Sequence, residues 1–225
     1  MIEIFKKLRL GLLGLIIVAV FASLAIVNNS DNNYPTINGA IIPHGRALDP
    51  FVLQDHFGLP FSNDDLLGKW HLISYGYTHC PDICPITLQV LTQLKNRLAN
   101  QPDYSDLQVL FYSVDHERDT VAQLYQYMPF FHQEFIGLTA DENHQQSARA
   151  FESSLGIKAI LEPLDEAQKN EFSGEYSVSH GVMLYLSNPA GRLQAVFQPQ
   201  RDEMGVQHFS ADKVLQDYIA VRDYF

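Results

Sequence analysis

The chain has 225 residues, of which 46% are hydrophobic and 18% charged, a composition that is typical of a folded globular protein and excludes a disordered or collagen-like chain. Its 26 acidic side chains outnumber the 15 basic ones. An acidic chain with no basic cluster beyond residue 9 is not expected to bind nucleic acid through phosphate neutralisation. Two cysteines are too few for a four-thiolate zinc site, so they are expected to act as one pair.

The amino-terminal segment predicts a membrane anchor. Residues 1–9 carry three basic side chains and are predicted to be cytoplasmic, and residues 10–27 follow without a charge. A helix of that length extends about 27 Å, enough to cross the hydrocarbon core of a bilayer. Basic residues before the span and none soon after it place the remainder of the chain outside the cytoplasm. A cleaved signal peptide is the alternative, because residues 23–25 (Ser-Leu-Ala) resemble a small-x-small cleavage site.

The segment after the anchor is predicted to be a linker over residues 28–44, and residues 45–225 are predicted to form one folded domain. A small hairpin is expected near residues 51–58. From there strands and helices alternate, which favours an α/β fold with parallel strand pairing. The predicted strands are 69–77, 107–114, 135–138, 182–186 and 193–197, and the predicted helices are 86–98, about 120–127, 142–155 and 210–224.

The two cysteines lie where the predicted strand 69–77 ends and the helix 86–98 begins. A helix amino terminus favours the thiolate, because its free N–H groups and its dipole lower the pKa of a nearby thiol. The spacing from Cys80 to Cys84 puts their α-carbons about 6 Å apart on a helical turn, close enough for a disulfide. The same pair can also clamp a metal ion. A redox pair and a metal-binding pair are therefore both open, whereas a purely stabilising disulfide is disfavoured by its short loop.

A third metal ligand has to come from the nine histidines. His180 directly precedes the predicted strand 182–186 and is expected to be held by the sheet. His79 is next to Cys80, but its side chain is expected to point away from that sulfur. Four others have no distinguishing feature and are expected at the surface or at the edge of the core: His44, His132, His144 and His208.

Residues 76–85, with the sequence Gly-Tyr-Thr-His-Cys-Pro-Asp-Ile-Cys-Pro, resemble the signature of the Sco/SenC family. The similarity continues in shorter motifs and covers about residues 45–200. Members of that family are membrane-anchored, thioredoxin-like copper proteins that assist assembly of the copper A site of cytochrome c oxidase. The resemblance implies a thioredoxin-like fold and a site for one copper ion formed by Cys80, Cys84 and His180. Two thiolates and one imidazole are a suitable ligand set for Cu(I), and they can also hold Cu(II).

The resemblance also implies a copper chaperone in the bacterial inner membrane, with its domain facing the periplasm. The expected partners are an oxidase subunit that carries the copper A site, or a chaperone that donates copper. A thiol reductant is expected as well, because an oxidised pair cannot supply two thiolates in the oxidising periplasm. The alternative function is a thiol–disulfide oxidoreductase, in which Cys80 and Cys84 form the catalytic pair.

Two positions depart from the family pattern. Ser179 stands where many members have an aspartate that could orient the ligand histidine. His116 stands where proline is usual, and it is expected to be a solvated turn residue. Its neighbours Asp115, Glu117 and Arg118 are expected to act as caps and surface ion pairs.

Overall fold

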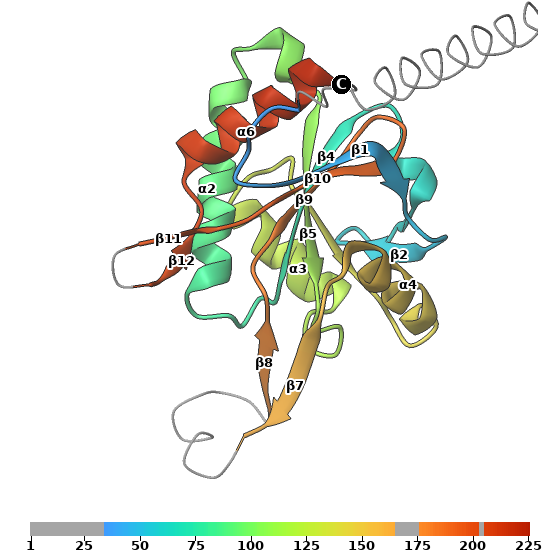
Figure 1. Cartoon of the computed structure of the whole chain (residues 1–225). Helices are drawn as coiled ribbons and strands as arrows, with labels where there is room; N and C mark the ends of the chain where they lie inside the picture. The colour runs from blue at the N-terminus through green and yellow to red at the C-terminus, as the bar shows by residue number, and fades with distance from the viewer. Residues whose placement is uncertain (1–33, 165–175, 203–204) are drawn as a thin grey trace, which may run out of the picture. The chain divides into compact units, whose positions relative to one another are not determined.

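An eight-stranded sheet provides the frame for the site (Figure 1). The computed structural model describes residues 34–164, 176–202 and 205–225. The strand order is β1-β10-β9-β4-β5-β6-β2-β3, in which β4, β5 and β6 are parallel and the other neighbours are antiparallel. The strands are β1 (Gly39–Ala47), β2 (Val52–Asp55), β3 (Pro60–Ser62), β4 (Trp70–Gly76), β5 (Leu107–Ser113), β6 (Ile136–Thr139), β9 (Leu184–Ser187) and β10 (Arg192–Phe197).

Helices cover both faces of this sheet. On one face lie α2 (Ile83–Leu98), α3 (Val121–Tyr127) and α6 (Ala211–Tyr224), and on the other lies α4 (Gln145–Leu155). Three short 3-10 turns span Asn63–Leu66, Pro102–Tyr104 and Met128–Phe130. This α/β arrangement, with parallel strands at the centre and helices on both faces, agrees with the predicted fold class.

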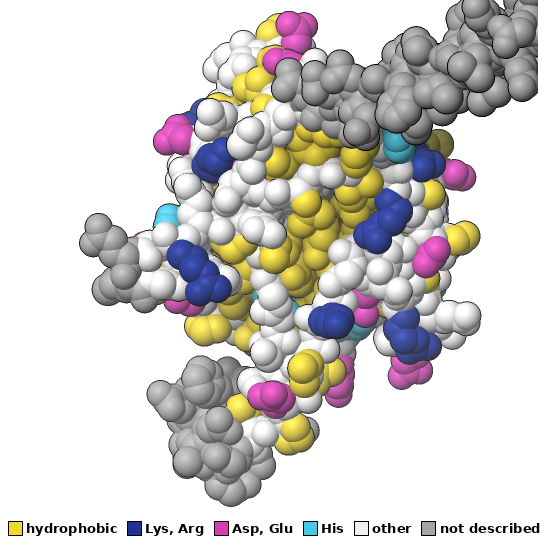
Figure 2. Space-filling model, viewed as in Figure 1, with side chains coloured by type: hydrophobic (Ala, Val, Ile, Leu, Met, Phe, Trp, Pro, Cys, Tyr) yellow, Lys and Arg dark blue, Asp and Glu magenta, His cyan; other side chains and the backbone are white. Residues whose placement is uncertain are grey.

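Two small ribbons stand apart from the main sheet. One joins β11 (Gln200–Arg201) and β12 (Gln207–His208), and the other joins β7 (Ala159–Pro163) and β8 (Tyr176–His180). Every residue of β7 is exposed. Figure 2 shows hydrophobic side chains on the β7–β8 ribbon at the bottom of the view, where Ile160 and Leu161 are both more than half exposed.

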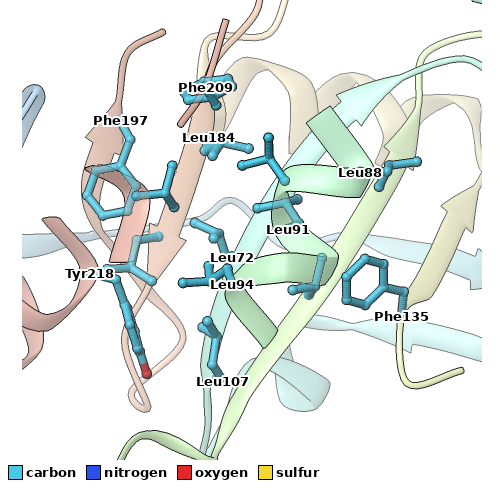
Figure 3. Packing of buried hydrophobic residues seen from close by; sticks show 14 of the residues in the cluster. Leu72, Leu88, Leu91, Leu94, Leu107, Phe135, Leu184, Phe197, Phe209 and Tyr218 are labelled. Atoms are coloured by element: carbon cyan, nitrogen blue, oxygen red, sulfur yellow. The ribbon is translucent and has the colours of Figure 1, made fainter. Parts of the chain in front are cut away.

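The core on the α2 side fixes that helix against the centre of the sheet (Figure 3). Side chains alternate along β4, so that Leu72 faces α2 and α6 while Ile73 faces α4. Leu88, Leu91 and Leu94 of α2 are fully buried in this core. Each buried leucine contributes about 1.5–3 kcal/mol. The first turn of α2, which carries Cys84, is therefore held at the carboxyl end of β4.

The structure confirms most predicted elements and corrects three points. The strand β1 begins at Gly39, so residues 39–44, expected as linker, are strand. The helix α2 begins at Ile83 rather than after Cys84. Pro85 lies inside its first turn, where a residue without an N–H is tolerated because the first N–H groups of a helix have no partner within the helix. The β7–β8 ribbon was not predicted, since its exposed residues show no apolar alternation.

The predicted cytoplasmic segment 1–9 and the predicted membrane span 10–27 lie outside the described residues. Within residues 34–164, 176–202 and 205–225, no helix combines the length and the hydropathy that a membrane crossing requires.

Candidate metal centre

Cys80 and Cys84 lie at the carboxyl end of β4. Cys80 is in the turn after the strand, where its N–H donates to the carbonyl of Tyr77 over 3.2 Å, and Cys84 is in the first turn of α2. Both are free thiols, and their residues are only 9% and 4% exposed. The sulfurs lie within hydrogen-bonding range of each other. The structure thus confirms the strand-to-helix junction on which the sequence argument depended.

The Cys84 sulfur packs directly on the backbone of Gly76, the last residue of β4. A Cβ atom at that position would lie 2.4 Å from Cys84 Sγ and 3.4 Å from Cε2 of Phe111. Real Cβ contacts are never that short, so a glycine is required for the sulfur to occupy this place. The signature motif begins at Gly76 for a steric reason that its sequence alone did not reveal.

His180 completes the group from a different part of the chain. It is the last residue of β8, and its Nε2 lies 3.8 Å from Cys84 Sγ. Its Nδ1 lies 2.6 Å from the carbonyl oxygen of Gly181. Because a carbonyl can only accept, we assign the ring proton to Nδ1, which leaves the Nε2 lone pair on the side of the sulfur. The predicted third ligand is therefore next to the cysteine pair and in the tautomer that binds a metal.

Two aromatic rings flank the imidazole of His180. The ring centroids of Tyr75 and Tyr77 lie 5.5 and 5.8 Å from that of His180. Ser179 is exposed and points to the opposite face of the strand. The contact that orients the imidazole comes from the Gly181 carbonyl, and the side chain at position 179 takes no part in it.

The two thiols have opposite acidities. The pKa of Cys80 lies far below that of an ordinary thiol because the Cys84 thiol donates a hydrogen bond to its thiolate, and the N–H groups of Asp82 and Cys84 add to this effect. The pKa of Cys84 is raised because its proton is held in the bond to Cys80 and because the sulfur is buried. The contact between the two sulfurs therefore favours the thiolate at Cys80 and the protonated thiol at Cys84.

This asymmetry predicts selective alkylation. At about pH 6 an ordinary thiol with a pKa of about 8.5 is almost entirely protonated and unreactive. We expect iodoacetamide to modify Cys80 at that pH and to leave Cys84 intact, because the lowered pKa keeps Cys80 ionised. The rate should fall only as the pH drops through the lowered pKa of Cys80. Mass spectrometry of the quenched protein measures both sites, and equal labelling of the two cysteines would contradict the prediction.

A buried carboxylate supports the turn between β4 and Cys80. Asp119 is fully buried and accepts hydrogen bonds from the backbone N–H of Thr78 at 2.8 Å, from the Thr78 hydroxyl at 2.5 Å and from Ser113 at 2.6 Å. Burial raises the pKa of Asp119. His79 lies beside it, with Nδ1 at 3.8 Å from Asp119 Oδ1. This role was not predicted from the sequence, because Asp119 lies beyond the end of β5 in a polar stretch that gives no sign of burial. The helix cap itself is Thr120, which accepts from the N–H of Gln123.

The segment after β5 corrects a further expectation. Asp115 is 1% exposed and pairs with Arg118 at 2.5 Å, so these residues are not a surface pair. His116 is also largely buried. Its Nδ1 accepts from the N–H of Ala140 at 3.2 Å, and its Nε2 lies 3.0 Å from the Tyr112 hydroxyl. These residues follow the buried strand β5 closely and are buried with it. Their polar side chains gave no sign of this burial in the sequence.

The remaining histidines do not join the site. His44 is exposed, as expected, and the other three featureless histidines are partly buried. His56 and His71 are almost fully buried, and burial lowers the pKa of both.

The three predicted ligands fit a soft metal ion by their chemistry. Two sulfurs and one imidazole nitrogen meet from the turn after β4, from α2 and from β8. No group of three or more His, Cys, Asp or Glu side chains in the described part of the chain is already closed around a metal position. Binding an ion would therefore require these ligands to release protons and draw together.

The family model described as SCO1/SenC matches residues 41–211 of this chain. A putative copper-binding protein from Stutzerimonas stutzeri is 35% identical over 191 residues, which cover 85% of this chain and 87% of that protein. The human mitochondrial SCO2 homolog is 38% identical over 141 residues, covering 63% of this chain and 50% of that protein. The chain spans about half the length of the mitochondrial relatives it matches.

Two solved structures with bound copper are also similar to this chain. Arabidopsis thaliana ScoI with copper bound has a TM-score of 0.64 and 27% identity, covering 79% of this chain and 99% of that one. Yeast Sco1 with copper bound has a TM-score of 0.62 and 25% identity, covering 80% of this chain and 90% of that one. The family model covers most of the chain, and a relative at 35% identity covers 85% of it, so this protein belongs to the SCO1/SenC family.

Proposed function

We propose that this protein binds one copper ion through Cys80, Cys84 and His180 and delivers it during assembly of the copper A site of cytochrome c oxidase. The observation that carries the proposal is the meeting of Nε2 of His180 with the sulfur of Cys84 at 3.8 Å, beside a second thiol. Two thiolates and an imidazole match the preference of Cu(I) for soft ligands. The copper-bound relatives and the similarity to a putative copper-binding protein support the choice of metal.

Delivery takes place by ligand exchange. The lowered pKa of Cys80 favours its thiolate, so it offers the first sulfur, and Cys84 releases its proton as the ion binds. His180 lies at the end of a ribbon outside the main sheet. Thiolates and imidazoles of an acceptor can replace these ligands one at a time. The partners of this proposal are an oxidase subunit with the copper A site, a copper-donor chaperone and a thiol reductant.

The proposed location is the bacterial inner membrane, with residues 10–27 as a single span and the folded domain in the periplasm. The distribution of charge around that span supports this orientation. A periplasmic location also explains the need for a reductant, because that compartment keeps cysteine pairs oxidised.

An anaerobic Cu(I) titration of the reduced full-length chain against a competing chelator tests the metal site. We expect one copper per chain in the wild type and an affinity lower by at least about a hundredfold in Cys84→Ser, equivalent to ~2.7 kcal/mol. Thr87→Ser is the control, because Thr87 is also buried on α2 but lies outside the site. Equal affinities for the wild type and Cys84→Ser would rule out the site.

A second function is favoured by the unequal acidities of the cysteines. Cys80, the thiolate, can attack a disulfide of an exported client, forming a mixed disulfide and releasing one client thiolate. Cys84 then attacks the Cys80 sulfur, which releases the second client thiolate and leaves a Cys80–Cys84 disulfide. The client gains two electrons, and an external dithiol reductant returns the pair to its starting state.

A further inference from the structure

Among the residues that the structure describes, the ribbon that carries His180 has no strand partner in the main sheet. There its β8 strand pairs with β7 alone, in a register that sets His180 opposite Ala159 and Tyr176 opposite Pro163. Strand pairing alone therefore does not fix the distance from His180 to the cysteines, which are attached to β4 and α2. A separate contact has to hold β8 against the body of the domain.

One such contact is the burial of Val178 in the core on the α4 side. A second is made at Tyr176 by Asp115 and Arg118, in the segment after β5. The Tyr176 hydroxyl donates to Asp115 Oδ1 over 2.7 Å, and Nη1 of Arg118 donates to the Tyr176 carbonyl over 3.2 Å. The guanidinium of Arg118 also lies over the Tyr176 ring, 4.1 Å from its centroid. Its Nε donates to Asp115 Oδ2 over 2.5 Å. Tyr176 is thus held through its ring, its hydroxyl and its backbone.

The same guanidinium also faces the cysteine side of the site. It lies 5.7 Å from the ring centroid of Tyr77, and Tyr77 in turn stands edge-on to the His180 ring. Tyr77 belongs to the turn that leads to Cys80. Arg118 therefore lies between the strand that carries the imidazole and the turn that carries the first thiolate, although it contacts no ligand itself.

Arg118 holds this position at a cost. Its side chain is 19% exposed, and its Nη2 is buried with no hydrogen-bond partner among the residues that the structure describes. A buried unsatisfied donor costs about 1–3 kcal/mol. A lysine would offer a charge without that extra N–H, but it could not reach Asp115 and the Tyr176 carbonyl together, because only the planar guanidinium presents several donors in a fixed fork.

We propose that Arg118, together with Asp115, is a positioning residue that sets the place of His180 relative to Cys80 and Cys84. This inference rests on the proposed copper site. Without the contact to Tyr176, β8 separates from the segment after β5, and the imidazole is no longer held where it can join the two sulfurs. The copper ion is then bound by the thiolates alone or with a poorly placed third ligand.

The test compares Arg118→Lys with the wild type and with His180→Ala. We expect Arg118→Lys to shift the thiolate-to-copper charge-transfer band and the electron paramagnetic resonance spectrum of the Cu(II)-loaded protein toward those of His180→Ala. Its Cu(I) affinity should fall about tenfold, or ~1.4 kcal/mol. In the copper-free protein, amide hydrogen exchange along β8 should become faster. Tyr176→Phe removes only the bond to Asp115 and should shift the same signals in the same direction by a smaller amount.

Arg222→Lys is the matched control. Arg222 also lies between two tyrosine rings, 5.3 Å from Tyr104 and 5.9 Å from Tyr218, and it pairs with Asp106. It belongs to α6, so it should lose stability without changing the copper spectrum. If Arg118→Lys and Tyr176→Phe both keep the wild-type spectrum and affinity, the two residues are only structural and the inference is wrong. If His180→Ala itself has the wild-type spectrum, the three-ligand site proposed above fails instead.

Discussion

Replacing His180 by alanine will weaken Cu(I) binding by at least about tenfold, or ~1.4 kcal/mol, and will leave the cysteine pair able to form a disulfide. The imidazole is the only ligand contributed by β8, and its Nε2 already faces the Cys84 sulfur at 3.8 Å. Cys80 and Cys84 are held by the turn after β4 and by α2, so removal of the ring leaves their mutual contact in place. The measurement is a chelator competition titration under anaerobic conditions, paired with the rate at which the reduced protein reduces a model disulfide.

His208→Ala is a suitable control, because His208 is a partly buried histidine on the separate β11–β12 ribbon. It should change neither quantity. The His180→Ala variant distinguishes copper binding from thiol–disulfide exchange as the function of the cysteine pair. If His180→Ala keeps wild-type copper affinity, copper is not held by the proposed ligands and thiol–disulfide exchange becomes the leading function. If both copper binding and disulfide exchange are lost, His180 acts on the thiols themselves.

The sequence was sufficient to predict the parts of the site that are local along the chain. The cysteine spacing is read directly from the sequence. Apolar periodicity predicts the strand before the pair, and the same periodicity together with Pro85 predicts the helix after it. The choice of His180 came from the family resemblance, and the structure places it beside Cys84. Regular, buried elements leave a clear pattern in the sequence, and the site stands where two of them meet.

What the sequence did not predict are contacts between segments far apart along the chain. The β7–β8 ribbon is exposed on one strand, so it lacks the alternation by which strands are recognised. The contact of Arg118 with Tyr176 joins residues separated by 58 positions, and a charged residue in a polar stretch is most often solvated. His116 was misread for the same reason, since burial by a neighbouring helix and strand leaves no local trace.

Replacing Gly76 by alanine adds a single methyl group, and we expect this group to disturb the site strongly. The new Cβ would lie 2.4 Å from Cys84 Sγ, so the sulfur has to move away from the end of β4. Cys84 is in the first turn of a helix whose buried leucines prevent it from shifting as a unit. Overpacking of this kind costs about 1–3 kcal/mol. We expect a lower midpoint in urea unfolding and, in the folded protein, at least about a tenfold loss of Cu(I) affinity.

Gly137→Ala separates the loss of stability from the loss of the site. Its Cβ would lie 2.8 Å from Cγ of Met128, but a methionine side chain is flexible and can move aside. This variant should lose stability and keep wild-type copper affinity. In Gly76→Ala the displaced sulfur can no longer donate its hydrogen bond to Cys80, so the pKa of Cys80 should rise toward that of an ordinary thiol and its alkylation at about pH 6 should slow. If Gly76→Ala shows normal copper affinity and normal alkylation, the close approach of Cys84 to the strand is not what places the two thiols.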